Sequence, residues 1–430
     1  MIWQSRKARP ASGKHCPAAL VFLDLMAWSS ASHPQPKYQV APGPWVQIDV
    51  GCRAQIPSGF EPVATPTPTW TGDCRDGLAT GHGHLLVHTS TGSIDYDGDL
   101  VAGMASGQGR QVLPDGSIYV GGFAGGLYEG VGTNQMPDGS HYQAHFHLGL
   151  VVPGVIHAFL KKGDVTIEGE LDATLRNGHA VVSQINGNRY EGDLKDTKFD
   201  GHGVMVFANG NRYDGQWRVG ARDGHGIMTS PQGDRFEGTW LNDMLEGHAM
   251  AQGANGNRFE GEYHLNKRTG HGIMLERDGS RTEGEWRDNA VNGFAVLTDT
   301  DGRGYEGYWR NNKWHGHGTF SDRNGSRTAG NWVDGALQGE AITTGRDGRI
   351  LSISQRRNNK RNGPGFLIYP DGARYDGNWR DGLPDGDGIL TEQSGTVFAG
   401  TWTKGCFRDG DRRAARGIDA SRADDPKTCP

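Results

Sequence analysis

Residues 190–281 repeat one pattern four times: YEGDLKDTKFDGHGVMVFANGNR (190–212), YDGQWRVGARDGHGIMTSPQGDR (213–235), FEGTWLNDMLEGHAMAQGANGNR (236–258) and FEGEYHLNKRTGHGIMLERDGSR (259–281). The 23-residue period continues without an insertion or deletion as far as Leu351. A fixed period of this kind indicates one supersecondary unit that is used many times and contacts only its neighbours. We therefore predict a repeat fold through which any function of the chain must operate.

Each period is typical of a β-hairpin. Side chains alternate between the two faces of a strand, so Tyr213, Gly215 and Trp217 share one face and the intervening polar residues share the other. The return turn, Asn209-Gly210 in one unit, is a strong local signal for a hairpin. Helical spacing is absent from the array. The predicted fold is all-β: an elongated, single-layer, twisted antiparallel sheet of about fifteen hairpin units with terminal caps.

The ends of the chain differ from the array in composition. Basic residues precede an apolar run from Ala18 to Trp28, and small residues follow it, which is the order found in secretory signals. A disordered leader is the alternative. We also expect a short helix around Arg412 to Ser421. The predicted regions are a signal peptide at 1–31, a Pro-rich cap at 32–69, N-terminal repeats with one degenerate unit at 70–166, the regular array at 167–406 and a polar tail at 407–430.

Bulk composition excludes some classes of protein. The net charge of −6 offers no electrostatic case for nucleic-acid binding. No run of 18 apolar residues occurs, so no transmembrane helix is expected. Glycine accounts for 69 of 430 residues and apolar residues for only 35%, which suits a thin sheet better than a deep core.

The cysteines fall into two groups that bracket the array, apart from Cys16 in the predicted signal. Cys52 and Cys74 precede the regular repeats, and Cys406 and Cys429 follow them. Four cysteines allow three connectivities, and buried free thiols remain an alternative. Two terminal disulfides, Cys52–Cys74 and Cys406–Cys429, are the expectation, and they would require an oxidising compartment. That expectation agrees with export to the periplasm or the outside. Without export the protein would be cytoplasmic.

The aromatic column has two interpretations. The rings pack on those of neighbouring units, which is a structural role. A single-layer sheet also leaves such a face incompletely covered, and a groove of aromatic residues is a natural place for a protein or peptide. The candidate partner-binding residues are Tyr213, Trp217, Phe236, Trp240, Phe259, Tyr263, Trp286, Tyr305 and Trp309.

A basic segment breaks the pattern where one unit lacks its aromatic residue and gains one residue. Arg356, Arg357, Lys360 and Arg361 lie there, and we expect a loop. A solvated loop is the simple interpretation. The functional one is a contact with an anionic partner, either a lipid headgroup or an acidic protein.

Nothing in the sequence marks a catalytic, metal or cofactor site. Histidines recur at one position of the unit, as in His202 and His225, but equivalent positions lie two strands, or about 10 Å, apart. That spacing is too large for one metal ion. Phosphate-binding, nucleophile-elbow, zinc-protease and calcium-loop motifs are absent. We predict no catalytic residue, no metal and no cofactor.

The unit YEGxWxxGxxxGxGxxxxxxDGxxY resembles the MORN repeat (membrane occupation and recognition nexus) over about three quarters of the chain. The start, with Cys52, then prolines, then Trp70-Thr71-Gly72-Asp73-Cys74, is similar to exported bacterial MORN proteins, and this likeness implies that Cys52 pairs with Cys74. It also implies a twisted antiparallel sheet that binds protein partners through its aromatic groove. Membrane-lipid binding is attributed to the family as well. Departures at 142–162 and 351–362 raise the question of whether the sheet is continuous there.

The resulting functional prediction is a non-catalytic scaffold that binds a protein or peptide. A peripheral membrane, anionic-lipid or envelope-binding protein is the alternative, and an enzyme with an unrecognised carboxylate site is the third hypothesis. A homodimer remains open.

Overall fold

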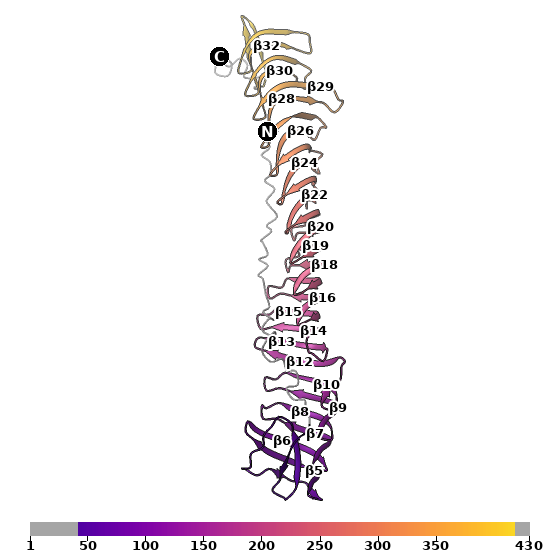
Figure 1. Ribbon diagram of the computed structural model, residues 1–430. Helices are drawn as coiled ribbons and strands as arrows, with labels where there is room; N and C mark the ends of the chain where they lie inside the picture. Colours follow the sequence, from indigo (N-terminus) through magenta and orange to yellow (C-terminus); the bar gives the residue numbers. More distant parts are fainter. Residues whose placement is uncertain (1–41, 418–430) are drawn as a thin grey trace. The chain divides into compact units, whose positions relative to one another are not determined.

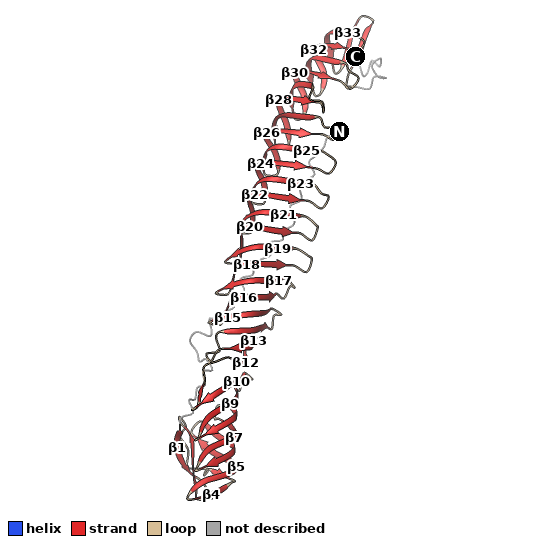
Figure 2. Cartoon of the chain, turned by 90° about the vertical axis from the view of Figure 1, so that its right-hand side faces the viewer, coloured by secondary structure: helices blue, strands red, loops and turns tan. Residues whose placement is uncertain are grey.

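The computed structural model describes residues 42–417, and these contain 35 strands and no helix (Figures 1 and 2). The predicted signal peptide lies outside the described residues. Two compact units make up the described chain. One holds residues 42–231 with Trp240–Asp243, and the other holds Gln232–Thr239 with residues 244–417. Each unit is a succession of antiparallel hairpins, so the all-β repeat prediction is confirmed.

The first unit contains β1 to β18, and β19 has residues in both units. Their bounds are β1 (Pro42–Gln47), β2 (Arg53–Pro57), β3 (Thr69–Trp70), β4 (Asp73–Arg75), β5 (Leu78–Thr89), β6 (Gly92–Val101), β7 (Met104–Val112), β8 (Ile118–Ala124), β9 (Leu127–Gln135), β10 (His141–His147), β11 (Leu150–Val151), β12 (Ile156–Lys162), β13 (Val165–Leu171), β14 (Gly178–Gln184), β15 (Arg189–Lys195), β16 (Lys198–Val206), β17 (Arg212–Arg218), β18 (Ala221–Thr229) and β19 (Arg235–Leu241).

The second unit contains β20 to β35. Their bounds are β20 (Met244–Gln252), β21 (Arg258–His264), β22 (Lys267–Leu275), β23 (Arg281–Arg287), β24 (Ala290–Thr298), β25 (Gly304–Arg310), β26 (Lys313–Ser321), β27 (Arg327–Val333), β28 (Ala336–Thr344), β29 (Ile350–Arg357), β30 (Lys360–Ile368), β31 (Arg374–Arg380), β32 (Leu383–Thr391), β33 (Val397–Thr403), β34 (Cys406–Asp409) and β35 (Arg412–Ala415).

The hairpin of β17 and β18 shows the common geometry. Tyr213 pairs with Met228, and the register then shifts so that Trp217 pairs with Arg222. The turn before this hairpin is closed by the Gly210 N–H, which donates to the Phe207 carbonyl oxygen at 2.8 Å. Gly210 has a φ of +82°, the left-handed conformation for which such turns select glycine. The Asn-Gly signal therefore places the turn correctly.

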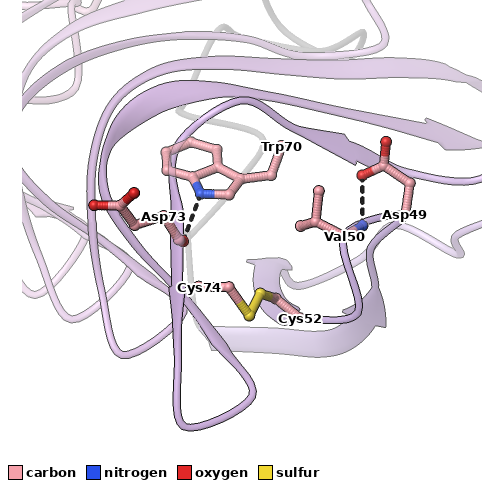
Figure 3. Close-up of a disulfide and its surroundings, with 6 residues drawn as sticks. All are labelled: Asp49, Val50, Cys52, Trp70, Asp73 and Cys74. Carbon is pink, nitrogen blue, oxygen red and sulfur yellow. Dashed lines mark hydrogen bonds between the residues drawn. A yellow bond between two sulfur atoms is a disulfide. The ribbon is translucent and has the colours of Figure 1, made fainter.

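The N-terminal cap is more structured than the expected extended segment. β1 and β2 form an antiparallel hairpin, and β2 touches β5 in parallel at Arg53 and Leu78. Cys52, just before β2, forms a disulfide with Cys74 in β4, with 5.9 Å between the Cα atoms (Figure 3). Nearby, the Trp70 indole N–H donates to the Asp73 carbonyl oxygen at 3.0 Å (Figure 3). The expected Cys52–Cys74 pairing is therefore present, whereas Cys429 lies outside the described residues.

The sheet remains paired through both departures from the period. At the degenerate unit, β10 pairs with β9 on one side and with β11 and β12 on the other. At the second, the inserted residue is absorbed by a register shift, with Thr343 opposite Ser352 and Thr344 opposite Ile350. A β-bulge of this kind accommodates one extra residue without ending the strand.

The expected helix near the C-terminus is wrong for the residues that the structure describes. Arg412–Ala415 forms β35, which pairs with β34. The reason is that Phe407 in β34 pairs in register with Trp402 of β33 and packs on it, with 5.4 Å between the two ring centroids. Another hairpin continues that packing better than a helix would.

A candidate partner-binding face

Alternation along each strand creates what we call the aromatic face. In β17, Tyr213, Gly215 and Trp217 are buried on it, whereas Arg212 and Gln216 are exposed on the opposite side. The rings meet edge to face, with 5.2 Å between the centroids of Tyr213 and Trp217. Edge-to-face pairs are a favourable arrangement of aromatic side chains. The face is thus a continuous packing layer within each unit.

The tryptophan in the first strand of a hairpin also bonds that hairpin to the previous one. The Trp286 indole N–H donates to the Gly272 carbonyl oxygen at 3.2 Å, fourteen residues earlier in the chain. Trp309 does the same with the Ala295 carbonyl oxygen at 3.1 Å. A buried indole N–H without an acceptor would be costly, and this bond removes that cost. The same bond is formed by Trp217, Trp240, Trp332, Trp379 and Trp402.

The opening ring of a unit depends on a glycine in its second strand. A Cβ atom added to Gly226 would lie 2.6 Å from Cε2 of Tyr213, and one added to Gly272 would lie 2.7 Å from Cε2 of Phe259. Both distances are far below van der Waals contact. Ala249 occupies the equivalent position one period from each glycine, and there the opening Phe236 is 36% exposed. The glycine is therefore a slot into which the ring fits.

The predicted groove residues are more deeply buried than a binding groove requires. Seven of the nine have side chains that are 6% exposed or less: Tyr213, Trp217, Trp240, Phe259, Tyr263, Trp286 and Tyr305. Trp309 is half-buried and Phe236 is exposed. The rings themselves mainly hold the fold together. Their role in binding a partner stays a prediction.

Beside the rings lies an apolar column that sequence reasoning overlooked. Its members come from the second strand of the hairpins and pair in register with the opening position, as Leu297 and Phe320 do with Tyr305. Both are half-buried and pack against the cluster of Tyr305 and Trp332. The signal was present in the sequence, because apolar residues recur at the sixteenth position of the period. In the second unit we call Met274, Leu297, Phe320 and Leu367 the apolar column. These four are half-buried, Thr343 interrupts the series between Phe320 and Leu367, and Leu390 beyond them is buried.

The opposite face is charged and internally paired. Arg212 donates to Asp214 at 2.8 Å, and His202 lies 3.0 Å from the same carboxylate. Exposed pairs of this kind contribute at most about 1 kcal/mol each. Among residues 42–417 no group of three or more histidine, cysteine or acidic side chains is placed to hold a metal ion. The exposed charged side chains of this face are in contact with solvent.

The basic segment is a hairpin and not the loop that we expected. Arg356 and Arg357 end β29, Lys360 and Arg361 begin β30, and only Asn358 and Asn359 form the turn. Because neighbouring residues in a strand point to opposite faces, the four side chains do not act as one patch. Arg356 and Arg361 pair in register on the aromatic face and are half-buried, whereas Arg357 and Lys360 are exposed.

The comparisons with known proteins identify the repeat. The model of the MORN repeat matches more than half of the chain, at residues 96–118, 119–141, 190–212, 213–235, 236–258, 259–281, 283–302, 305–327, 329–348, 357–374 and 375–397. The chain belongs to the MORN-repeat family. MORN repeats form scaffolds that generally carry no catalysis of their own. In the part of the chain that the structure describes, no helix is long and apolar enough to span a membrane.

Other comparisons add little to this assignment. A comparison with curated proteins gives no match. Among solved structures, the TCP domain of SAS-4 from Drosophila melanogaster, in complex with a proline-rich motif of Ana2, is 12% identical with a TM-score of 0.22, covering 42% of this chain and 86% of that one. A mutant TCP10 domain of CPAP from Danio rerio is 11% identical with a TM-score of 0.21, covering 57% and 99%. These TM-scores support no statement about function.

Proposed function

We propose that this MORN-repeat chain is a non-catalytic scaffold that binds a protein or peptide partner along the aromatic face of its second unit. The observation that carries the proposal is the apolar column of Met274, Leu297, Phe320 and Leu367, which stays half-buried beside fully buried rings. Met274, Leu297 and Phe320 recur every 23 residues, and such a row of apolar side chains offers contact area to an extended or helical segment. Tyr305, Trp286 and Trp309 behind it are held by hydrogen bonds, so this part of the face is ordered before a partner binds.

The test is affinity purification of the full chain with mass spectrometry, compared with a double Leu297→Ser and Phe320→Ser variant. Trp286 is a poor choice for such a test, since it is only 6% exposed and its loss would destabilise the repeats around it. Tyr308→Ser is the matched control, because Tyr308 is 55% exposed on the opposite face. Partners lost in the double variant and kept in the control support the proposal. Partners that persist in the double variant would rule out this face.

We also infer that the protein is exported. The Cys52–Cys74 disulfide supports this, because such bonds persist in oxidising compartments. Cell fractionation followed by alkylation with a thiol-reactive mass tag tests the inference. The expected result is an unmodified Cys52 in the periplasmic or extracellular fraction. A fully alkylated Cys52 in the cytoplasmic fraction would contradict it.

A further inference from the structure

One cross-strand pair on the aromatic face consists of two arginines. Arg356 pairs in register with Arg361. In the neighbouring hairpins the same two positions hold a tryptophan and an apolar residue, Trp332 with Leu337 on one side and Trp379 with Pro384 on the other. Two like charges thus replace an apolar contact, in a strand whose other buried residues on this face are Ser352 and Ser354. Such a substitution is costly unless something neutralises it.

The chain itself supplies no counter-charge to this pair. Within residues 42–417 the only hydrogen bond from either guanidinium is from Arg356 Nη1 to the Asn359 carbonyl oxygen, at 3.2 Å. Nε of both arginines is buried without a hydrogen-bond partner. Burial, and then repulsion by Arg361, lower the pKa of Arg356 to about 10. Burial also lowers the pKa of Arg361.

Arg222, the equivalent arginine of another hairpin, has a carboxylate partner that Arg361 lacks. Arg222 occupies the position of Arg361 in its own hairpin, and its Nε donates to Asp243 Oδ1 at 2.8 Å. The backbone N–H of Asp243 donates to the Arg222 carbonyl oxygen, and Gly382 makes this same bond with Arg361. Gly382 therefore stands where the first unit has its aspartate. At the same position Arg268 has Asn289, whose carbonyl oxygen accepts from its Nη2 at 3.0 Å, whereas Arg361 has neither acceptor.

A further donor lies close to the pair. The Tyr369 hydroxyl is buried without a hydrogen-bond partner, and burial raises its pKa to about 12 against the opposing effects of Arg416 and Arg361. Arg361 also stacks near Trp379, with 5.2 Å from its guanidinium carbon to the ring centroid. Leu367 of the apolar column follows in the same strand. The two guanidinium groups and the Tyr369 hydroxyl thus lie beside the apolar surface of Trp379 and Leu367.

We propose that Arg356 and Arg361 bind the carboxylate of an aspartate or glutamate side chain of a peptide partner whose neighbouring apolar residues lie on the apolar column. The proposal rests on the proposed scaffold function and specifies the chemistry of its partner. Guanidinium groups recognise carboxylates through charge-assisted, often bidentate hydrogen bonds. Such a ligand supplies the acceptor that Asp243 supplies to Arg222.

A membrane surface fits this site less well. Binding to anionic lipid depends on several exposed basic residues acting together. Of the four basic residues here, two are half-buried and Lys360 lies 3.9 Å from Asp381. Only Arg357 is left fully exposed without an ion pair among the described residues. The net charge of −6 adds to the repulsion from an anionic bilayer.

The experiment uses the full chain and two peptide probes, acetyl-Leu-Glu-Leu-amide and its Gln counterpart, titrated by calorimetry or by shifts of the arginine Nε–H resonances. We expect the Glu probe to bind about tenfold more tightly than the Gln probe, as a charge-assisted hydrogen bond implies. Arg356→Met and Arg361→Met abolish this preference. Arg357→Met makes the same change in net charge on the other face and leaves it intact.

A second pair of variants tests the missing acceptor. Gly382→Asp places a carboxylate beside Arg361 and removes the preference, whereas Gly382→Asn keeps it. Gly382 has a φ of +91°, so both substitutions strain the backbone, but Asp and Asn are the side chains that tolerate positive φ best and no atom lies within 4 Å of a Cβ there. Because Gly382→Asp and Gly382→Asn place side chains of the same size at the same backbone conformation, loss of folding does not explain a preference that only Gly382→Asp removes.

Several outcomes overturn the proposal. The proposal fails if the wild-type chain binds the Glu and Gln probes equally. It also fails if Arg357→Met loses the preference for the Glu probe as fully as Arg356→Met and Arg361→Met do. Cosedimentation with phosphatidylglycerol vesicles that requires Arg356 and Arg361, without preference for the Glu probe, assigns the site to lipid instead. A natural partner captured equally by Arg356→Met, but lost in the Leu297 and Phe320 variant, removes the carboxylate site and leaves the scaffold function standing.

Discussion

Tyr213 fits against Gly226 so closely that any side chain at the glycine would overlap the ring. The same relationship joins Phe259 to Gly272. Where the second-strand position holds alanine, the opening residue changes accordingly: Thr282 accompanies Ala295, Thr328 accompanies Ala341, and Phe236 beside Ala249 is left exposed. Ring and glycine therefore form one packing unit.

Gly272→Ala is expected to expel Phe259 from its slot. Overpacking of this kind destabilises by about 1–3 kcal/mol, which urea unfolding measures. The reciprocal Ala249→Gly variant provides a slot for Phe236. Glycine within a strand normally lowers the free energy of unfolding, and here burial of Phe236 should offset some or all of that loss. Equal stability of Gly272→Ala and the wild type would contradict the slot.

Trp286→Ala is expected to remove about 3–5 kcal/mol locally, because it deletes a buried ring and leaves the Gly272 carbonyl oxygen without its donor. Trp286→Phe keeps most of the packing and should lose about 1 kcal/mol. Since repeats contact only their neighbours, hydrogen exchange should accelerate around β21 to β25 and stay slow in β33. Uniform acceleration throughout the second unit would refute this locality. Tyr308→Ala, on the exposed face, should change stability by no more than about 0.5 kcal/mol.

Removal of the Cys52–Cys74 disulfide should loosen the N-terminal cap. The bond closes a loop of 22 residues, for which a stabilisation of about 2–4 kcal/mol is typical. A double Cys52→Ser and Cys74→Ser variant should lose hydrogen-exchange protection in β1, β2 and β4, while β21 to β33 remain unchanged. Protection that is unaffected in β1 and β2 would show that the cap is held by its strand pairing alone.

Stability should fall at acidic pH in part through Glu246. A hydrogen bond from the Leu265 backbone N–H, together with His264, holds the pKa of Glu246 below its usual value of 4.5. The ionised form is thus favoured by folding, so the stabilisation is present above pH 4.5 and disappears as the pH falls through the lowered pKa. Glu246→Gln should show a shallower decline in melting temperature below pH 4.5. Glu340→Gln, an exposed residue without an ion pair in the described chain, is the control, and identical slopes in both variants would contradict the assignment.

The period and the turn signals were enough to predict the hairpins, the two faces and the order of the strands. Burial of the rings was harder to predict, because the cover over Tyr305 comes from second-strand residues such as Leu297 and Phe320, whose role depends on register. The segment around Arg356 was misjudged for a related reason. An inserted residue usually suggests a loop, but the bulge opposite Thr343 and Thr344 absorbs it and keeps Arg356 in a strand.

The closeness of ring and glycine bears on how such a chain grows. Tyr213 and Gly226 both belong to residues 213–235, so an in-frame duplication of that segment copies the two matched partners together. Contacts across the new junction include a tryptophan N–H bond to a backbone carbonyl oxygen, as between Trp217 and Gly203, and an edge-to-face contact of that tryptophan with the opening ring of the preceding repeat, as between Trp217 and Tyr190. A duplicated copy carries the tryptophan and the opening ring that make these contacts, so recombination can change the number of repeats while each new junction keeps the same packing.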